Sequence, residues 1–497
     1  MIRASRSAVV SPTAVVVVAQ STSVAAAQTG LPKPGILPEK TSVSLRRPGR
    51  RRRSGSRGQT IDAEVDFSGE KACLGNPCDG GPCPAVDHRR HGGRVDWRRL
   101  SLFARARRCV PAIIVTETSA YPYLGPVMMM AGAALATGLA AWLVRRFSPD
   151  AAGSGIPHVE AVLQGSLAQA PARLIPVKFA GGVLAIGSGL ALGREGPSVQ
   201  MGVTAAHVIG GFFRRDTKDR SALIAGGAGA GLATAFNSPG AGAIFVLEEL
   251  VGRFDPRIAL VALGASAGAI SVSRSLLGNS LDFNVADLAS GGGIELVLFL
   301  ILGLFAGLLS VGHNRGLLAT LTLAERIGGS IELRAAGVGA VVGLLAWSTP
   351  HIVGGGDGLT QNALNGELLL VALPALFLFR LVLGTASYAA GTPGGLFAPL
   401  LVLGAVSGLA FGYVVDAAIP GLTVRPEAFA VVGMGAFLAG SVRAPLTGMV
   451  LVIEMTGSSS LLLPLLAGCF GSMLVAEAMQ DLPIYAALKA RAAKSVR

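Results

Sequence analysis

The stretch that decides the fold is GREGPSVQ, residues Gly193–Gln200. It lies between two apolar stretches rich in small residues, FAGGVLAIGSGLAL at 179–192 and MGVTAAHVIGGFF at 201–213. An arginine and a glutamate therefore stand side by side in sequence that suits a bilayer. A charge inside a bilayer costs about 3 kcal/mol or more, so residues of this kind usually mark a function. The pair predicts a functional centre, provided that the rest of the chain also suits a membrane.

The composition is that of a membrane protein. Of 497 residues, 51% are hydrophobic, only 14% are charged and 68 are glycine, and the mean hydropathy is +0.58. A soluble chain of this length carries roughly a quarter charged residues. Abundant small residues let helices approach closely where lipid offers no hydrophobic drive for their association. We therefore expect an all-α polytopic protein that crosses the cell (inner or plasma) membrane several times.

The formal charge of +13 does not point to a nucleic-acid partner, because its distribution is uneven. Residues 1–108 hold 20 Lys and Arg against 8 Asp and Glu, which leaves 22 against 21 for the rest of the chain. Basic sequence rich in Gly, Pro and Ser is usually disordered. We expect residues 1–115 to be a disordered tail or a wrongly assigned start, and 116–497 to form the membrane domain. Salt-sensitive binding by the tail alone would favour the alternative of a nucleic-acid or lipid-binding protein with a structural membrane body.

The sequence offers no pattern for a metal, a cofactor or an enzyme. Cys73, Cys78 and Cys83 lack the CxxC pairs and histidines of a zinc site. Cys109 and Cys469 are isolated thiols, and we find no nucleophile beside a base. We therefore expect no cofactor, no metal and no enzymatic activity.

After about residue 110 the chain consists of apolar segments separated by short polar stretches. Helices are also predicted to start near Glu195, Ala222 and Pro239. Many segments are shorter than the roughly 20 residues of a full span, which predicts broken helices that end against protein or water. The basic segments are expected on the cytoplasmic side, namely Arg145 and Arg146, residues 214–220, Arg253 and Arg257, and the C-terminus. The segments are 126–144, 155–167, 174–192, 258–277, 293–325, 335–347, 367–385, 397–418, 428–440, 445–455 and 460–479.

An internal repeat relates the two halves of the chain. Residues 225–248 align with 431–454 at an offset of 206, which matches Pro239 with Pro445 and Glu248 with Glu454. Matched halves with Gly- and Pro-broken helices are typical of secondary transporters, whose site lies at the repeat interface. We expect inverted repeats over roughly 120–255 and 290–480.

Three motifs place glycine just before a helix start and proline near its first turn. They are GSGIP at 153–157, GREGP at 193–197 and GLFAP at 395–399. Glycine lets a ligand approach the backbone, and proline has no N–H to leave unpaired. Helix N-termini present free N–H groups and the positive end of the helix dipole. Three of them converging inside a bilayer predict a site that can hold and release a small anion.

These motifs, in this order and together with RAPLTGMVLVIEMT at 443–456, resemble the CLC family of chloride channels and chloride/proton exchangers. The resemblance covers roughly residues 120–495. It implies the CLC inverted-repeat fold of the prokaryotic type, without C-terminal CBS domains, in a homodimer with one anion path per subunit. Its implied partners are chloride, protons and the lipid bilayer, with no nucleic acid.

The resemblance also implies a set of chloride contacts. Ser154 and Tyr485 would donate their hydroxyls to a central chloride, and the backbone of Leu396 and Phe397 would complete that site. The amides around Arg194 would face an outer site. The other implied chloride contacts are Gly155, Ile156, Gly196 and Ala398.

Two glutamates would carry the protons by the same resemblance. Glu195 would occupy an anion site when ionised and swing away when protonated, and its poorly solvated setting makes protonation accessible near neutral pH. Glu249 matches the internal proton-transfer glutamate of the exchangers, where passive channels commonly carry an apolar residue. The expected function is therefore chloride/proton antiport. The alternatives are a passive voltage- or pH-gated chloride channel, a Glu195 that is merely paired with Arg194, and a Glu249 that is a solvated acid beside Arg253.

Overall fold

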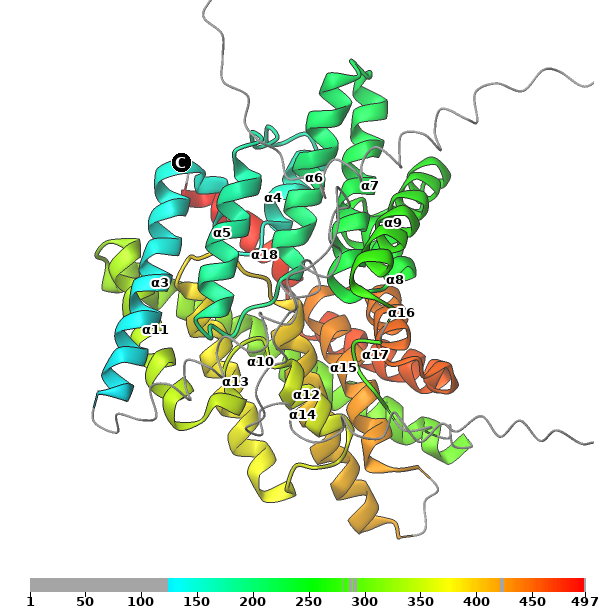
Figure 1. Ribbon diagram of the computed structural model, residues 1–497. Coiled ribbons are helices and arrows are strands. Elements are labelled where there is room, and N and C mark those ends of the chain that lie inside the picture. The colour runs from blue at the N-terminus through cyan, green and yellow to red at the C-terminus, as the bar shows by residue number, and fades with distance from the viewer. Residues whose placement is uncertain (1–123, 280, 286–287, 289–292, 421–423, 496–497) are drawn as a thin grey trace, which may run out of the picture. The chain divides into compact units, whose positions relative to one another are not determined.

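The computed structural model describes residues 124–495 apart from 280, 286–287, 289–292 and 421–423, so the expectation for residues 1–115 lies outside it (Figure 1). Every regular element of this part of the chain is a helix. Seven of these helices are long and apolar enough to cross a membrane. Most of the others are shorter, as the segment lengths predicted.

The described part of the first half contains two long spans with shorter helices between them. The α-helices are α3 (Gly125–Phe147), α4 (Ile156–Leu163), α5 (Leu174–Gly187), α6 (Glu195–Phe212), α7 (Thr217–Phe236), α8 (Pro239–Phe245) and α9 (Pro256–Leu277). A 3-10 turn, η1 (Pro149–Ala151), precedes α4, and a π-helical turn, η2 (Val246–Leu250), continues α8.

The second half repeats this order after one long helix. Its α-helices are α10 (Gly293–Ile327), α11 (Ile331–Ser348), α12 (Asp357–Leu364), α13 (Leu373–Ala389), α14 (Phe397–Ala418), α15 (Pro426–Val442), α16 (Pro445–Thr456), α17 (Leu462–Ala478) and α18 (Ile484–Ser495). The 3-10 turns are η3 (Pro350–Ile352), η4 (Leu370–Ala372) and η5 (Ser459–Leu461).

Helix starts in the two halves correspond one by one. The first residues of α3, α8 and α9 are each 206 positions before those of α11, α16 and α17, and α6 begins 202 positions before α14. The helix α10 has no counterpart among the described residues of the first half. The offset found in the sequence therefore marks a true structural repeat.

The repeats run in opposite directions, as the caps of α8 and α16 show. Glu248, just after α8, accepts hydrogen bonds from the backbone N–H groups of Leu446 at 3.0 Å and Thr447 at 2.7 Å, at the start of α16. Glu454, near the end of α16, accepts bonds of 3.0 Å from the two amides that follow Pro239 at the start of α8. Each helix therefore ends beside the start of the other, so the two are antiparallel. A carboxylate also suits the positive end of a helix dipole.

Glycine pairs allow the closest helix contacts in both repeats. Gly202 of α6 faces Gly227 of α7, and Gly404 of α14 faces Gly433 of α15 at the equivalent positions. A Cβ atom added to Gly227 would lie 2.5 Å from the Gly202 carbonyl oxygen, and one added to Gly404 would lie 2.7 Å from the Met434 Cα. Real Cβ atoms do not approach backbone so closely, so only glycine permits this packing.

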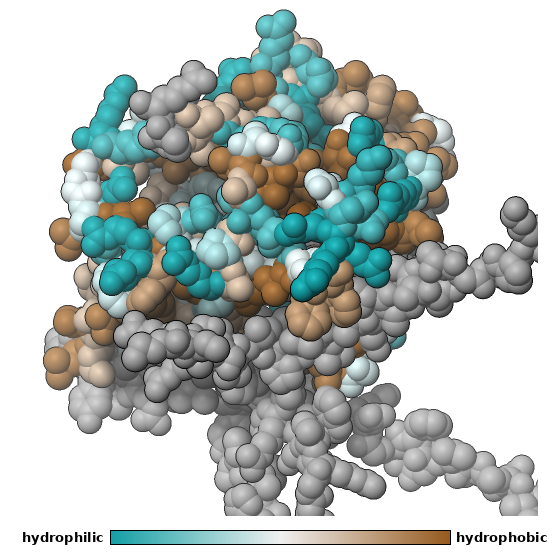
Figure 2. Space-filling view, turned by 90° about the horizontal axis from the view of Figure 1, so that it is seen from above, coloured by the Kyte–Doolittle hydropathy of each residue, from teal (hydrophilic) through white to brown (hydrophobic). Residues whose placement is uncertain are grey.

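The basic loops lie at one end of the helices, as predicted. In Figure 1 the end of α3, which carries Arg145, the turn between α6 and α7, and the end of α18 all lie at the top. Arg257 at the start of α9 forms an ion pair with Asp219 at the start of α7, which brings a fourth basic segment to this end. Figure 2 looks down on it and shows hydrophilic residues gathered between apolar ones. The arrangement agrees with a cytoplasmic face by the positive-inside rule.

Several helix boundaries differ from the predictions: the segments 155–167 and 174–192 end as helices at Leu163 and Gly187, and the segment 335–347 begins as α11 at Ile331. The helix α7 begins at Thr217 instead of near Ala222, because the Asp216 side chain accepts a 2.8 Å hydrogen bond from the Asp219 N–H and caps it there. The first turn of α7 is polar, so the sequence pattern predicted a loop there. The segment predicted at 367–385 is α13, shifted to Leu373–Ala389 after the separate turn η4.

Candidate functional site

The three glycine motifs meet at one place and are tied together by backbone hydrogen bonds. Gly193 and Gly395 exchange two bonds, of 2.9 and 2.7 Å, in an antiparallel bridge. Gly153 donates to the Thr392 carbonyl at 3.2 Å and accepts from the Gly394 N–H at 3.0 Å. The strand-like segment before α14 thus lies between the loops that precede α4 and α6.

Three helices start from this junction. Their N-cap residues are Gly155 for α4, Arg194 for α6 and Leu396 for α14, and none of the three starts has a side-chain cap. The first N–H groups of an α-helix have no partner within the helix. Gly155 has φ of 85°, a left-handed conformation that favours glycine, and α4 could not start here in the same way with another residue. The junction therefore gathers uncapped N–H groups and three positive dipole ends in the interior.

Three buried polar atoms face the same region without a hydrogen-bond partner in the described part of the chain. They are the Ser154 Oγ, one carboxylate oxygen (Oε2) of Glu195 and the Tyr485 hydroxyl, on side chains that are 1%, 2% and 0% exposed. The hydroxyls of Ser154 and Tyr485 lie near each other without reaching hydrogen-bond geometry. Buried polar atoms are almost always paired, so three together call for an explanation such as an ion.

Close packing brings the remaining predicted residues to these atoms. A Cβ added to Gly196 would lie 2.6 Å from the Ser154 carbonyl oxygen, so α6 begins directly against the Ser154 loop. A Cβ added to Gly395 would lie 3.1 Å from the Glu195 Oε2. The backbone N–H of Ala398 also lies near the Glu195 carboxylate.

The aromatic rings of the site are packed against one another. The Phe397 ring stacks on the Tyr485 ring, with centroids 6.1 Å apart, and meets the Phe245 ring at 5.6 Å. Ile156, like Phe397, is fully buried. The structure thus brings together the predicted chloride contacts and Glu195.

Arg194 does not neutralise Glu195 directly. Its Nε donates to the Ala235 carbonyl at 3.0 Å, near the end of α7, and its guanidinium lies 4.0 Å from Asp282. No ion pair or hydrogen bond between the side chains of Arg194 and Glu195 occurs in the described structure. The alternative of a simple Arg–Glu pair is therefore wrong.

Glu248 and Glu249 are adjacent in the chain but face different surroundings. Glu248 caps α16, whereas Glu249 lies partly buried in η2 within electrostatic reach of Glu160 on α4 and Lys489 on α18. Glu160 and Lys489 form an ion pair. The π-helical turn shifts the register between the two glutamates and the preceding helix, and π-bulges often occur at functional sites. Glu249 is thus partly buried and forms no ion pair with Arg253 in the described structure.

Tyr485 lies near both acids that were predicted to carry protons. Its phenol is within electrostatic reach of both Glu195 and Glu249. One buried hydroxyl thus has both carboxylates in its surroundings.

Sequence reasoning missed a buried lysine that shapes the site. Lys178 of α5 is fully buried, and its Nζ donates to the carbonyl oxygens of Ala151 at 3.0 Å and Gly153 at 2.8 Å. No carboxylate lies within ion-pair distance of it in the described residues. The signal was available, because a single lysine stands inside the apolar segment 174–192.

Two residues of α13 were also missed. The Ser387 Oγ accepts a 3.1 Å hydrogen bond from the Ala191 N–H, and the Tyr388 hydroxyl lies against Gly153. Both support the loops that carry the glycine motifs. Nothing in the local sequence distinguishes them from other polar residues of an apolar helix.

An inverted repeat of helices, with an uncapped, polar junction where the two halves meet, is typical of a membrane transport protein. The model of a family described as voltage gated chloride channel matches residues 132–477, and the chain belongs to this family. It is a multi-pass membrane protein.

Individual relatives agree with the family. The chain is 39% identical over 373 residues to the H(+)/Cl(-) exchange transporter ClcA of Vibrio parahaemolyticus, covering 71% of this chain and 77% of the relative. It is 38% identical over 407 residues to the protein of the same name from Yersinia pseudotuberculosis, covering 80% and 83%. A solved structure of a slow cyanobacterial Cl-/H+ antiporter is 32% identical, with a TM-score of 0.75 over 81% of this chain and 97% of the other.

Proposed function

We propose that the protein exchanges chloride for protons across the membrane. The observation that carries the proposal is the group of three buried, unpartnered polar atoms of Ser154, Glu195 and Tyr485, where three uncapped helix starts meet. Two of the atoms belong to hydroxyls that can donate to an anion, and the third to an acid that can carry a proton. The relatives named as exchangers support the same function.

Chloride would bind at the junction through neutral donors. The hydroxyls of Ser154 and Tyr485 donate hydrogen bonds, and the free N–H groups at the starts of α4 and α14 supply partial positive charge. Those starts carry Gly155 and Ile156 in one case and Leu396, Phe397 and Ala398 in the other. The Lys178 Nζ donates to the Ala151 and Gly153 carbonyls and so fixes the loop that carries Ser154. Donors of this kind hold an anion weakly enough to let it leave.

Glu195 would act as the gate because its carboxylate competes with chloride. Its Oε2 lies against Gly193 and Gly395, at the junction of α6 and α14. When ionised, the side chain is itself an anion and uses the donors of the site. When protonated, it has no charge to hold it there and chloride replaces it. The same side chain therefore moves a proton and controls the anion.

Glu249 would pass protons between the cytoplasm and Glu195. It lies near Glu160 and Lys489 of the basic end and within electrostatic reach of Tyr485. A carboxylate held between an aqueous end and a buried site can accept and release a proton in turn.

We also propose, from the family, that two copies associate. The exposed apolar residues Leu463, Leu466 and Phe470 on one face of α17 are available to a second copy or to lipid, and the mass of the purified protein in detergent tests this.

The test is flux from liposomes, with chloride efflux and external pH recorded together. The parent protein is expected to take up protons as chloride leaves. Glu249→Gln is expected to move chloride without protons, because the amide cannot transfer a proton. Glu325→Gln is the control, since Glu325 is a largely exposed acid that pairs with Arg491. Chloride flux without proton movement in the parent would refute exchange and leave a passive channel.

A further inference from the structure

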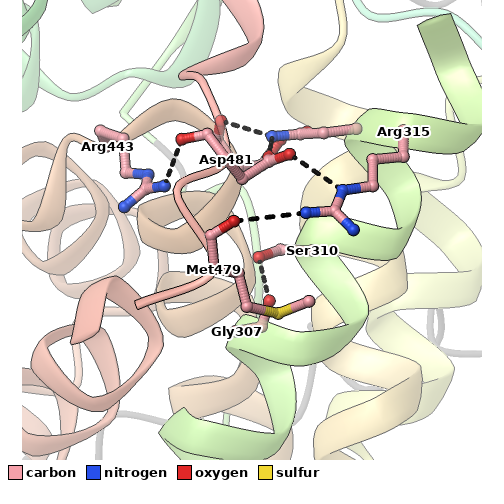
Figure 3. A network of polar contacts seen from close by, with 8 residues as sticks. Gly307, Ser310, Arg315, Arg443, Met479 and Asp481 are labelled. Atoms are coloured by element: carbon pink, nitrogen blue, oxygen red, sulfur yellow. Dashed lines mark hydrogen bonds and ion pairs between the residues drawn. The ribbon is translucent and has the colours of Figure 1, made fainter. Parts of the chain in front are cut away.

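We propose that Asp481 is a positioning residue for the chloride site, acting through Tyr485. Asp481 lies in the linker between α17 and α18, four residues before Tyr485. The proposal rests on the proposed transport function. Hydrogen bonds and ion pairs from two sides fix this linker in place (Figure 3).

The linker is held first by α10. One carboxylate oxygen of Asp481 accepts from the Asn314 side-chain amide at 3.0 Å, and the other accepts from the Arg315 Nε at 3.4 Å. The same guanidinium donates to the Met479 carbonyl at 3.3 Å, as Figure 3 shows. Met479 and Asp481, the first and third residues of the linker, are therefore bound to neighbouring residues of α10.

The linker between α17 and α18 is held from the other side by the junction of α15 and α16. Arg443, which follows α15, donates to the Asp481 backbone carbonyl at 2.8 Å (Figure 3) and to the Met473 carbonyl of α17 at 3.3 Å. Arg443 adopts a left-handed conformation with φ of 71°, which ends α15. Its side chain is only 9% exposed.

The anchoring extends into the interior. Asn314 exchanges two hydrogen bonds with Ser441 of α15, of 2.5 and 3.2 Å, and both residues are buried. The Asp481 side chain is 10% exposed. Surface ion pairs contribute little, but polar groups in a buried network are costly to leave without partners. The Asp481 contacts are therefore a strong constraint on where the linker lies.

Tyr485 depends on this constraint because it has no polar anchor of its own. Its hydroxyl has no hydrogen-bond partner in the described structure, and its ring is located by packing on Phe397. Pro483 and Ile484 join the linker to the first turn of α18, where the Ala487 N–H donates to the Pro483 carbonyl at 2.9 Å. A displaced linker thus displaces the hydroxyl at the chloride site. A shift of about 1 Å matters for a group that must donate to an ion.

A double-mutant cycle tests the proposal with Asp481→Ala, Tyr485→Ala and the pair together. Chloride affinity is measured calorimetrically on the purified protein, and the chloride/proton ratio in liposomes. Asp481→Ala is expected to weaken chloride binding about tenfold, the scale of one hydrogen bond to a charged group. Combined with Tyr485→Ala, it is expected to add nothing further, because both changes remove the same contact. Asp481→Asn, which retains an acceptor for Asn314, is expected to recover part of the affinity.

The matched control is Glu325→Ala, which removes the ion pair between Glu325 and Arg491 farther along α18. It is expected to leave chloride affinity unchanged. If Asp481→Ala does not yield folded protein, Arg315→Gln takes its place in the cycle, because Arg315 is half exposed and contacts the linker from outside.

Losses that add in the double mutant, or parental chloride affinity in the Asp481 and Arg315 variants, would overturn the proposal. A parent protein without coupled flux would instead refute the proposed function.

Discussion

The replacement Glu195→Gln separates proton coupling from chloride movement. The side chain is buried, and its Oε2 lies against Gly193 and Gly395 at the junction of α6 and α14. A glutamine has nearly the same shape, so the packing of the junction is retained. It cannot ionise, so the tethered anion that competes with chloride is lost together with the proton carrier.

The size of the effect follows from the titration of one carboxyl group. Once the ionised form predominates, the protonated fraction falls about tenfold for each pH unit. Since the protonated side chain is the one that leaves the anion site, chloride flux in the parent falls as pH rises. In Glu195→Gln this dependence disappears, and proton movement falls to zero while chloride still moves.

The assay is chloride efflux from liposomes at a series of pH values set equal on both sides, with proton movement recorded in lightly buffered medium. Glu325→Gln, which changes an exposed acid, is expected to keep the parental pH dependence. Proton uptake by Glu195→Gln, or a pH dependence as steep as that of the parent, would refute the role of Glu195 as gate and carrier.

Three further variants test the supporting structure. Lys178→Met leaves two buried carbonyl oxygens unpaired, at a cost of about 1–3 kcal/mol each, and is expected to lower thermal stability and weaken calorimetric chloride binding. In Gly227→Ala the new Cβ would lie 2.5 Å from the Gly202 carbonyl oxygen, so the monodisperse fraction in size-exclusion chromatography is expected to fall. The control is Gly264→Ala, whose Cβ meets nothing within 4 Å and which is expected to be neutral. Glu248→Ala removes the cap of α16 and is expected to lower stability by about 0.5–2 kcal/mol with the chloride/proton ratio unchanged, so altered coupling would contradict a purely structural role.

Helix starts were the most predictable feature of this fold. The starts of α6, α8, α14 and α16 fall at or beside the glycine and proline motifs, where the sequence marks both the end of one element and the start of the next. The repeat was equally visible, because both halves use the same breaks. The start of α7 was missed because a polar first turn beyond the apolar core has no hydrophobic pattern.

The site was predictable only as far as its motifs extend. Ser154, Glu195 and Phe397 belong to three motifs whose shared design points to one anion site, and the structure brings these motifs together. The different surroundings of Glu248 and Glu249 could not be foreseen, since they depend on α16, α4 and α18, which lie far away in the sequence.

The contacts made by the supporting polar residues were beyond reach for the same reason. Lys178 bonds to carbonyls about 25 residues earlier, and Asp481 bonds to a helix more than 160 residues earlier. Tertiary contacts at such separations leave no periodicity in the sequence. The one indication in the sequence is a lone charge inside an apolar segment, as at Lys178.

The most direct test of exchange is whether a chloride gradient drives protons uphill. Liposomes that contain the parent protein are loaded with high chloride, placed in low chloride at equal pH, and followed with a pH electrode. Coupled exchange predicts that the external medium becomes more alkaline as chloride leaves, against the growing proton gradient, and that a protonophore reverses the change. Chloride efflux with no proton uptake against the gradient would contradict the account.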